Sequence, residues 1–153
     1  MKDLVLKFHI HTCKPVLTPI ISCTCIALED GTLLSNPSEY RSMVGALQYL
    51  TMTRPDIAFA VDIVSQIMHA PRTTHLYCVK RMLRYLQGIP VHGLFLRASS
   101  SNSIVTSYFD ADWAGCPNTR RSATGYMVLL GSNLISWHAK KQPTVSKSSI
   151  EAE

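Results

Sequence analysis

The hydrophobic pattern of this chain changes its period once, near residue 90, and that change most limits the folds open to it. Between residues 36 and 90 the apolar side chains recur at helical spacing. After residue 91, short runs rich in β-branched and aromatic residues are separated by turns rich in serine and glycine. Helices followed by strands are typical of the α+β class, so we predict a small helical bundle followed by an antiparallel sheet.

Three helices are predicted in the first part. Asn36-Pro37-Ser38-Glu39 has the residues of a helix start, and apolar residues then repeat at helical spacing up to Leu50. A second helix begins at Pro55 and stops before Pro71, and a third runs from about residue 74 to 87. Each helix has one apolar stripe, so the three should pack together.

Short strands are predicted at 94–97, 104–109, 125–130 and 134–138, with a further strand at 144–146. Ser148 and Ser149 then cap a new helix, which reaches only residue 153. A helix of one turn cannot cover the face of a sheet. We therefore expect exposed apolar side chains on the sheet, around Tyr126, Val128 and Ile135.

The expected organisation is an irregular N-terminal segment (1–35), a three-helix segment (36–90) and a sheet segment (91–153). Residues 1–10 are compatible with a short helix. Residues 15–27 are mostly apolar or small and end in Cys25-Ile26-Ala27, as a weak signal peptide would. Pro15 and Pro19 interrupt that stretch, and the alternative is an extended linker.

The cysteines and the apolar runs exclude two further classes of protein. Five cysteines without regular spacing do not form a disulfide framework, and Cys23-Thr24-Cys25 lacks the spacing of a zinc knuckle, so no metal site is expected. No stretch approaches 18 consecutive apolar residues, so no membrane span and no membrane partner are expected.

Charge is distributed unevenly along the second part of the chain. Residues 63–153 carry ten basic and four acidic side chains, and the acids form two pairs, Asp110 with Asp112 and Glu151 with Glu153. Two interpretations stay open. The first is a solvated basic surface, and the second is a polyanion site with metal ions between the carboxylates.

Residue-specific matches in sequence order resemble the copia-type retrotransposon polyprotein. They are Tyr40–Leu50 with Thr53–Ile57, Lys80–Leu86 with Gly88, Asp110–Gly115, Arg120–Ser122, Gly125-Tyr126, Ile135–Trp137 and Glu151–Glu153. The resemblance implies the region after the reverse-transcriptase palm and the start of an RNase H-like domain, truncated after its first strands. It also implies that the palm, with its Tyr-x-Asp-Asp metal site, lies upstream of residue 1.

In that family the RNase H domain cuts the RNA strand of a hybrid with four acidic positions and two Mg²⁺ ions. By resemblance, Asp110 matches the first acid and Glu153 the second, and the other two would lie beyond residue 153. We therefore expect remnant carboxylates without an intact catalytic site, no enzyme and no cofactor, with Mg²⁺ bound only by the intact parent. For Asp112 we expect a simple pairing with Arg120 or Arg121.

A second resemblance rests on four residues. Arg81-Met82-Leu83-Arg84 fits the Arg-x-Leu-Arg (RxLR) signature of secreted oomycete effectors, which is associated with delivery into plant cells. The third helix also explains this tetrapeptide, with Leu83 facing the core and Lys80, Arg81 and Arg84 on the solvent side. The acidic element that often follows the signature is missing, since the next acid is Asp110.

Together these observations predict a non-catalytic, copia-derived protein. In the first interpretation it is a secreted RxLR-type effector that enters a host plant cell and suppresses defence or cell death by binding an unknown host protein. In the alternative it is an inactive, intracellular polyprotein remnant with no independent function. Basic residues beside Tyr77 and Tyr85 on the third helix also predict weak, non-specific contact with nucleic acid.

Overall fold

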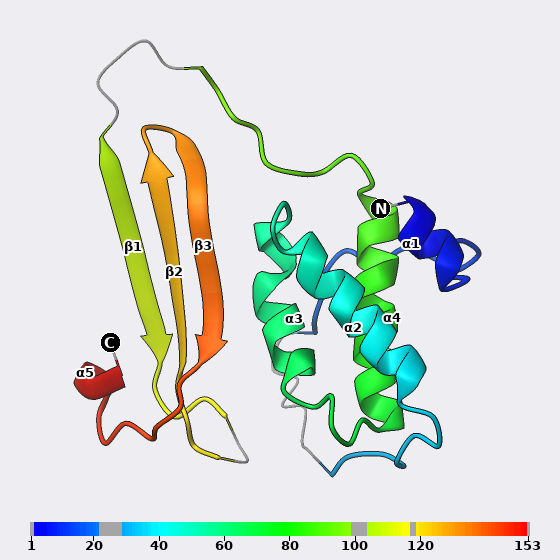
Figure 1. Cartoon of the computed structure of the whole chain (residues 1–153). Coiled ribbons are helices and arrows are strands. Elements are labelled where there is room, and N and C mark those ends of the chain that lie inside the picture. Colours follow the sequence, from blue (N-terminus) through cyan, green and yellow to red (C-terminus); the bar gives the residue numbers. More distant parts are fainter. Residues whose placement is uncertain (1, 22–28, 99–103, 117–118, 153) are drawn as a thin grey trace. The chain divides into compact units, whose positions relative to one another are not determined.

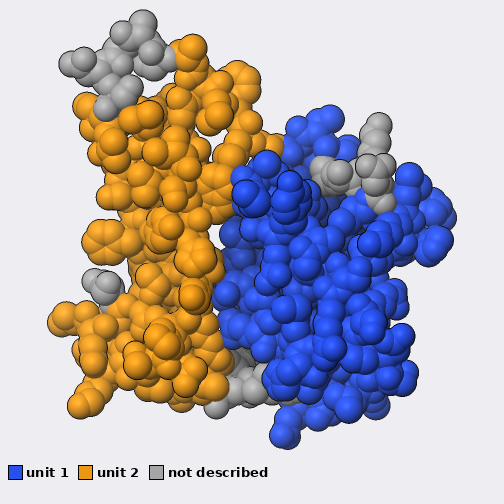
Figure 2. Space-filling model, in the orientation of Figure 1, with its two compact units in different colours: residues 1–92 blue, residues 93–153 orange. Residues whose placement is uncertain are grey.

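The computed structural model describes residues 2–21, 29–98, 104–116 and 119–152, which form two compact units (Figures 1 and 2). Residues 1–92 form the first unit and residues 93–153 the second. The described elements of the first unit are helices, and those of the second are three strands and a short helix. The predicted α+β class is therefore confirmed.

The helices of the first unit are α1 (Lys2–Lys7), α2 (Ser38–Leu50), the 3₁₀ helix η1 (Pro55–Ile57), α3 (Ala58–Ser65) and α4 (Thr73–Gly88). Helix α2 starts as predicted, because the side-chain oxygen of Asn36 accepts the backbone N–H of Ser38 at 3.0 Å. The helix predicted from Pro55 ends at Ser65, earlier than expected. At this end the carbonyl of Asp62 accepts both the Ser65 hydroxyl at 2.8 Å and the backbone N–H of Gln66 at 3.3 Å.

A single apolar core joins the helices of the first unit. Tyr40 on α2 is fully buried, and its hydroxyl donates to the carbonyl of Val64 on α3 at 2.7 Å. Val5 of α1 and Ile10 just after it belong to the same core, with exposed fractions of 7% and 4%. The remaining buried apolar members come from α2, η1, α3 and α4: Met43, Val44, Leu47, Ile57, Ala60, Val61, Val64, Val79, Met82, Leu83 and Leu86.

The second unit contains a consecutive antiparallel sheet in the order β1 (Val105–Asp112), β2 (Ala123–Leu130) and β3 (Asn133–Lys141). The predicted strands at 94–97 and 144–146 do not form, so that prediction is wrong for both. Instead of a neighbouring strand, the backbone of Arg97 meets the side-chain amide of Asn133, which accepts its N–H at 2.7 Å and donates to its carbonyl at 2.8 Å. These two bonds occupy the backbone N–H and carbonyl of Arg97, which would otherwise bond to a neighbouring strand.

Both faces of this sheet carry apolar side chains. The register places Phe109, Tyr126 and His138 in one row, and Tyr108, Met127 and Trp137 in the adjacent row on the opposite face. Tyr126 and Ile135 are exposed, as predicted. Val128 is half-buried rather than exposed, so the prediction is wrong for this residue; its partners in the neighbouring strands are Ser107 and Ser136. Within the described residues, no helix has the length and hydropathy needed to cross a bilayer.

Candidate functional site

Asp110 lies in β1 with its side chain exposed to solvent. Its cross-strand partner in β2 is Gly125, whose partner in β3 is Ala139, so its row contains two small residues beside it. The Asp110 carboxylate accepts the backbone N–H of the next residue at 2.9 Å. Within the part of the chain that the structure describes, this local bond is the one hydrogen bond of the carboxylate, which is therefore open to a ligand.

Asp112 lies two positions later and has a different role. Its carboxylate accepts the backbone N–H of Ala123, and a side chain at Gly115 would clash with this carboxylate. Among the described residues Asp112 forms no ion pair with Arg120 or Arg121, so the expected pairing is wrong. The backbone N–H is closer because β1 and β2 meet at this point, and Asp112 thus closes the loop between them.

The second acidic pair lies in and after the short helix α5 (Ser149–Ala152). Glu151 accepts the backbone N–H of Lys147 at 2.7 Å, and its own N–H donates to the Ser148 hydroxyl at 3.2 Å. This arrangement closely resembles a capping box, so the Glu151 carboxylate stabilises the helix start. Glu153, the second expected acid, lies outside the described residues.

The described carboxylates do not gather as the ligands of a magnesium ion usually do. Mg²⁺ is held by near-octahedral oxygen ligation, commonly through more than one carboxylate or phosphate group. Of the acids expected here, Asp110 is open, whereas Asp112 and Glu151 are committed to backbone N–H groups. Across residues 2–21, 29–98, 104–116 and 119–152, no three His, Cys, Asp or Glu side chains cluster as metal ligands would.

The Arg81–Arg84 tetrapeptide lies in the middle of α4, and half of it is buried. Met82 and Leu83 are fully buried in the helical core. The Arg81 guanidinium donates to the Thr18 hydroxyl at 2.8 Å, and Nε of Arg84 donates to the carbonyl of Lys14 at 2.7 Å. The inward position of Leu83 agrees with the helix interpretation, but the arginines bind the chain's own N-terminal segment rather than solvent alone.

We call residues 11–18 the strap, because they run along α4 and are tied to it by side chains of that helix. Besides the two arginines, the side-chain amide of Gln87 donates to the carbonyl of His11 at 3.0 Å. A side chain at Gly88 would meet Cβ of Pro15 at 3.1 Å, so the glycine permits the close approach of the strap. Sequence reasoning missed the strap, because its contacts join positions about 60 to 75 residues apart.

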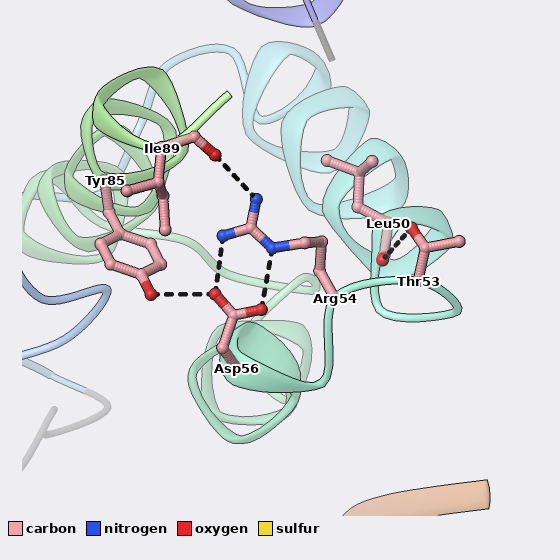
Figure 3. A network of polar contacts seen from close by, with 6 residues as sticks. All are labelled: Leu50, Thr53, Arg54, Asp56, Tyr85 and Ile89. Atoms are coloured by element: carbon pink, nitrogen blue, oxygen red, sulfur yellow. Dashed lines mark hydrogen bonds and ion pairs between the residues drawn. The ribbon is translucent and has the colours of Figure 1, made fainter. Parts of the chain in front are cut away.

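A second feature that sequence reasoning missed is a polar network within the helical unit (Figure 3). Arg54, with an exposed fraction of 2%, donates to both carboxylate oxygens of Asp56 at 2.8 and 2.7 Å. The Tyr85 hydroxyl donates to the same carboxylate at 2.9 Å, and Arg54 also reaches the carbonyl of Ile89 at 3.4 Å. The network therefore ties the segment between α2 and α3 to the end of α4.

The pKa values of this network follow from its geometry. Burial alone raises the pKa of Asp56, but the hydrogen bonds from Arg54 and Tyr85 and the charge of Arg54 outweigh it and leave the pKa below its ordinary value. The pKa of Tyr85 is raised by burial and by its bond to Asp56. The sequence gives one indication of this network: Arg54 and Asp56 are two residues apart, and an apolar segment follows them.

Known proteins match the chain along nearly its whole length. It is 49% identical over 151 residues to the retrovirus-related Pol polyprotein from transposon RE1 of Arabidopsis thaliana, and 48% identical over 151 residues to that from transposon RE2. These matches cover 99% of the chain but 10% of each polyprotein, so the chain spans about a tenth of their length. No protein-family model and no solved structure matches it.

A shorter relative is described as a secreted effector rather than as a polyprotein. The secreted RxLR effector protein 161 of Plasmopara viticola is 47% identical over 116 residues, which cover 74% of this chain and 80% of that protein. The same sequence family therefore includes long polyproteins and one short protein described as a secreted effector.

Proposed function

The chain belongs to the copia-type retrotransposon Pol polyproteins, and we propose that it is a segment of such a polyprotein with no enzymatic activity of its own. The observation that carries this proposal is the match to two Pol polyproteins over 99% of the chain. The segment would contain the end of the reverse-transcriptase region and the start of an RNase H-like domain. In this account the chain is a remnant without an independent function.

The sheet supports the RNase H-like assignment in part. Three consecutive antiparallel strands, with Asp110 in the first and a helix beginning after the third, agree with the start of such a domain. The remnant carboxylates would be Asp110 and Glu153. Asp112 and Glu151 each accept a backbone N–H, and among the described residues no three acidic, histidine or cysteine side chains cluster around a common point.

The test is a cleavage assay. The purified chain is incubated with a labelled RNA–DNA hybrid and Mg²⁺, beside an Asp110→Asn variant that keeps the size of the side chain. The proposal expects no cleavage above background from either protein. Cleavage by the chain that disappears in Asp110→Asn would show a working nuclease and overturn the proposal.

A secreted effector is the second candidate, and the similarity to the RxLR effector of Plasmopara viticola favours it. In this account the chain would be exported, enter a host plant cell and bind a host protein. Two observations count against it. Residues Val5 and Ile10, which a cleaved leader would remove, lie in the helical core, and Met82 and Leu83 of the tetrapeptide are fully buried. The cleavage-like sequence Cys25–Ala27 lies outside the described residues.

Export is the measurement that separates the two candidates. Residues 1–27 are fused to a reporter that lacks its own signal, and the reporter is assayed in the medium. No export is the expected result. Export of the reporter would favour the effector, and expression of the whole chain in leaves challenged with a cell-death elicitor would then test suppression, with Arg81→Ala/Arg84→Ala for comparison.

A further inference from the structure

We propose that the face of α4 beneath the strap is a docking site for an extended acidic peptide, and that the strap occupies this site in the isolated chain. The site consists of Arg81, Arg84 and Gln87 with the exposed Lys80 beside them. The proposal does not depend on the absence of enzymatic activity.

The contacts of the strap show which kind of ligand this face accepts. Arg81, Arg84 and Gln87 are spaced three residues apart, and they bind Thr18, Lys14 and His11 in the reverse order. The strap therefore runs antiparallel to α4. Two of its three acceptors are backbone carbonyls, which any extended polypeptide provides.

The strap itself brings no negative charge to this face. It contains no acidic residue, and Lys14 adds a further positive charge. In the described part of the chain neither Arg81 nor Arg84 forms an ion pair with a carboxylate. Within the same part, Nε of Arg81 and the side-chain oxygen of Gln87 are buried without a hydrogen-bond partner. The present occupant therefore satisfies this face incompletely.

An acidic peptide would satisfy it better. A carboxylate in the place of the Thr18 hydroxyl would accept a charge-assisted bond from Arg81, which is stronger than a bond between a cation and a neutral hydroxyl. Its negative charge would also attract the positive charges of the nearby Arg84 and Lys80. We choose a polypeptide rather than a nucleic acid because the occupant that the structure shows is a polypeptide bound through its carbonyl groups.

The test uses the whole chain and a fluorescent octapeptide. The probe has the sequence of residues 11–18 with Lys14→Glu and Thr18→Glu, and the matched control peptide has the natural sequence. Because charge-assisted bonds replace neutral ones, we expect the acidic peptide to bind about tenfold more tightly in fluorescence anisotropy. Amide hydrogen exchange at residues 11–18 of the chain should increase when it binds, since the strap is displaced.

Three variants of the chain locate the site. Arg81→Ala/Arg84→Ala should weaken binding of the acidic peptide about tenfold, whereas Lys140→Ala, which removes an exposed charge from β3, should change it by less than about twofold. Thr18→Glu should also weaken it, because the strap then competes better. This variant leaves α4 untouched, so it tests the site even if the double variant fails to fold.

Several results would overturn the proposal. They are equal affinity for the two peptides, binding that survives both Arg81→Ala/Arg84→Ala and Thr18→Glu, and unchanged hydrogen exchange in the strap. A fourth is binding of single-stranded oligothymidylate that depends on Arg81 and Arg84 and is tighter than that of the acidic peptide, which would make the face a nucleic-acid site.

Discussion

The carboxylate of Asp56 accepts two hydrogen bonds from the guanidinium of Arg54, at 2.8 and 2.7 Å, across a single intervening proline. Pro55 fixes the backbone at the start of η1 and thereby brings the two side chains together. Tyr85 of α4 donates to the same carboxylate, so a local pair becomes a link between helices. The first two predictions concern this link.

Replacing Asp56 with alanine should lower the free energy of unfolding of the helical unit by about 3 kcal/mol, because the buried Arg54 guanidinium loses its counter-ion. The measurement is denaturant-induced unfolding followed by circular dichroism. Glu39→Ala, which removes an exposed carboxylate from the first turn of α2, serves as the control and should cost much less. A loss at Asp56 no larger than that at Glu39 would contradict the assigned role.

The same carboxylate should make stability depend on pH. The pKa of Asp56 in the folded chain lies below its ordinary value of 3.8, because the bonds from Arg54 and Tyr85 outweigh the effect of burial. Its contribution is therefore complete above about pH 4 and is lost as the pH falls through the lower folded pKa. In acid titrations of stability, Asp56→Asn should show a shallower loss below pH 4 than the natural chain. Parallel curves would refute this assignment.

Gly115→Ala should destabilise the loop between β1 and β2. The added carbon would clash with the carboxylate of Asp112, which accepts the N–H of Ala123. We expect a cost of about 1–3 kcal/mol and faster hydrogen exchange at the Ala123 amide. As a control, Gly45→Ala meets no atom within 4 Å and should stabilise α2 by about 0.5–1 kcal/mol. Unchanged exchange at Ala123 in Gly115→Ala would show that Asp112 does not close the loop.

Tyr40→Phe removes the hydroxyl that joins α2 to Val64 of α3. The expected cost at neutral pH is about 1–2 kcal/mol, since a buried hydrogen bond is lost. Burial raises the pKa of Tyr40 in the folded chain above its ordinary value of 10.0. Stability of the natural chain should therefore decline as the pH rises above about 10, where the unfolded chain ionises first. The difference from Tyr40→Phe should then shrink in thermal unfolding at alkaline pH, and a constant difference would contradict this explanation.

The sequence predicted those parts of the fold that depend on residues close together in the chain. Asn36-Pro37 predicted the start of α2, and the helical spacing of Leu83 and Leu86 predicted the inward face of α4. The strands at 94–97 and 144–146 were wrongly predicted, because β-propensity does not supply a neighbouring strand. The amide of Asn133 instead takes the backbone groups of Arg97.

The candidate site was predicted less completely than the fold. The sequence indicated Asp110 but could not show that Asp112 binds a backbone N–H rather than an arginine. The tetrapeptide at Arg81 was identified, yet its ties to Lys14 and Thr18 depend on the path of a distant segment. Such long-range contacts leave no periodic trace in the sequence, so only the structure reveals them.

The central claim is that the N-terminal residues are part of the fold, as expected of an internal Pol segment rather than of a removable leader. The direct measurement compares the free energy of unfolding of the whole chain with that of residues 28–153. Val5 and Ile10 each contribute about 1.5–3 kcal/mol by burial, and domains of this size are stable by only about 5–15 kcal/mol. The account therefore predicts that the shorter chain loses several kcal/mol or its cooperative unfolding. A shorter chain that unfolds cooperatively, with a free energy within about 1 kcal/mol of the whole chain, would contradict it.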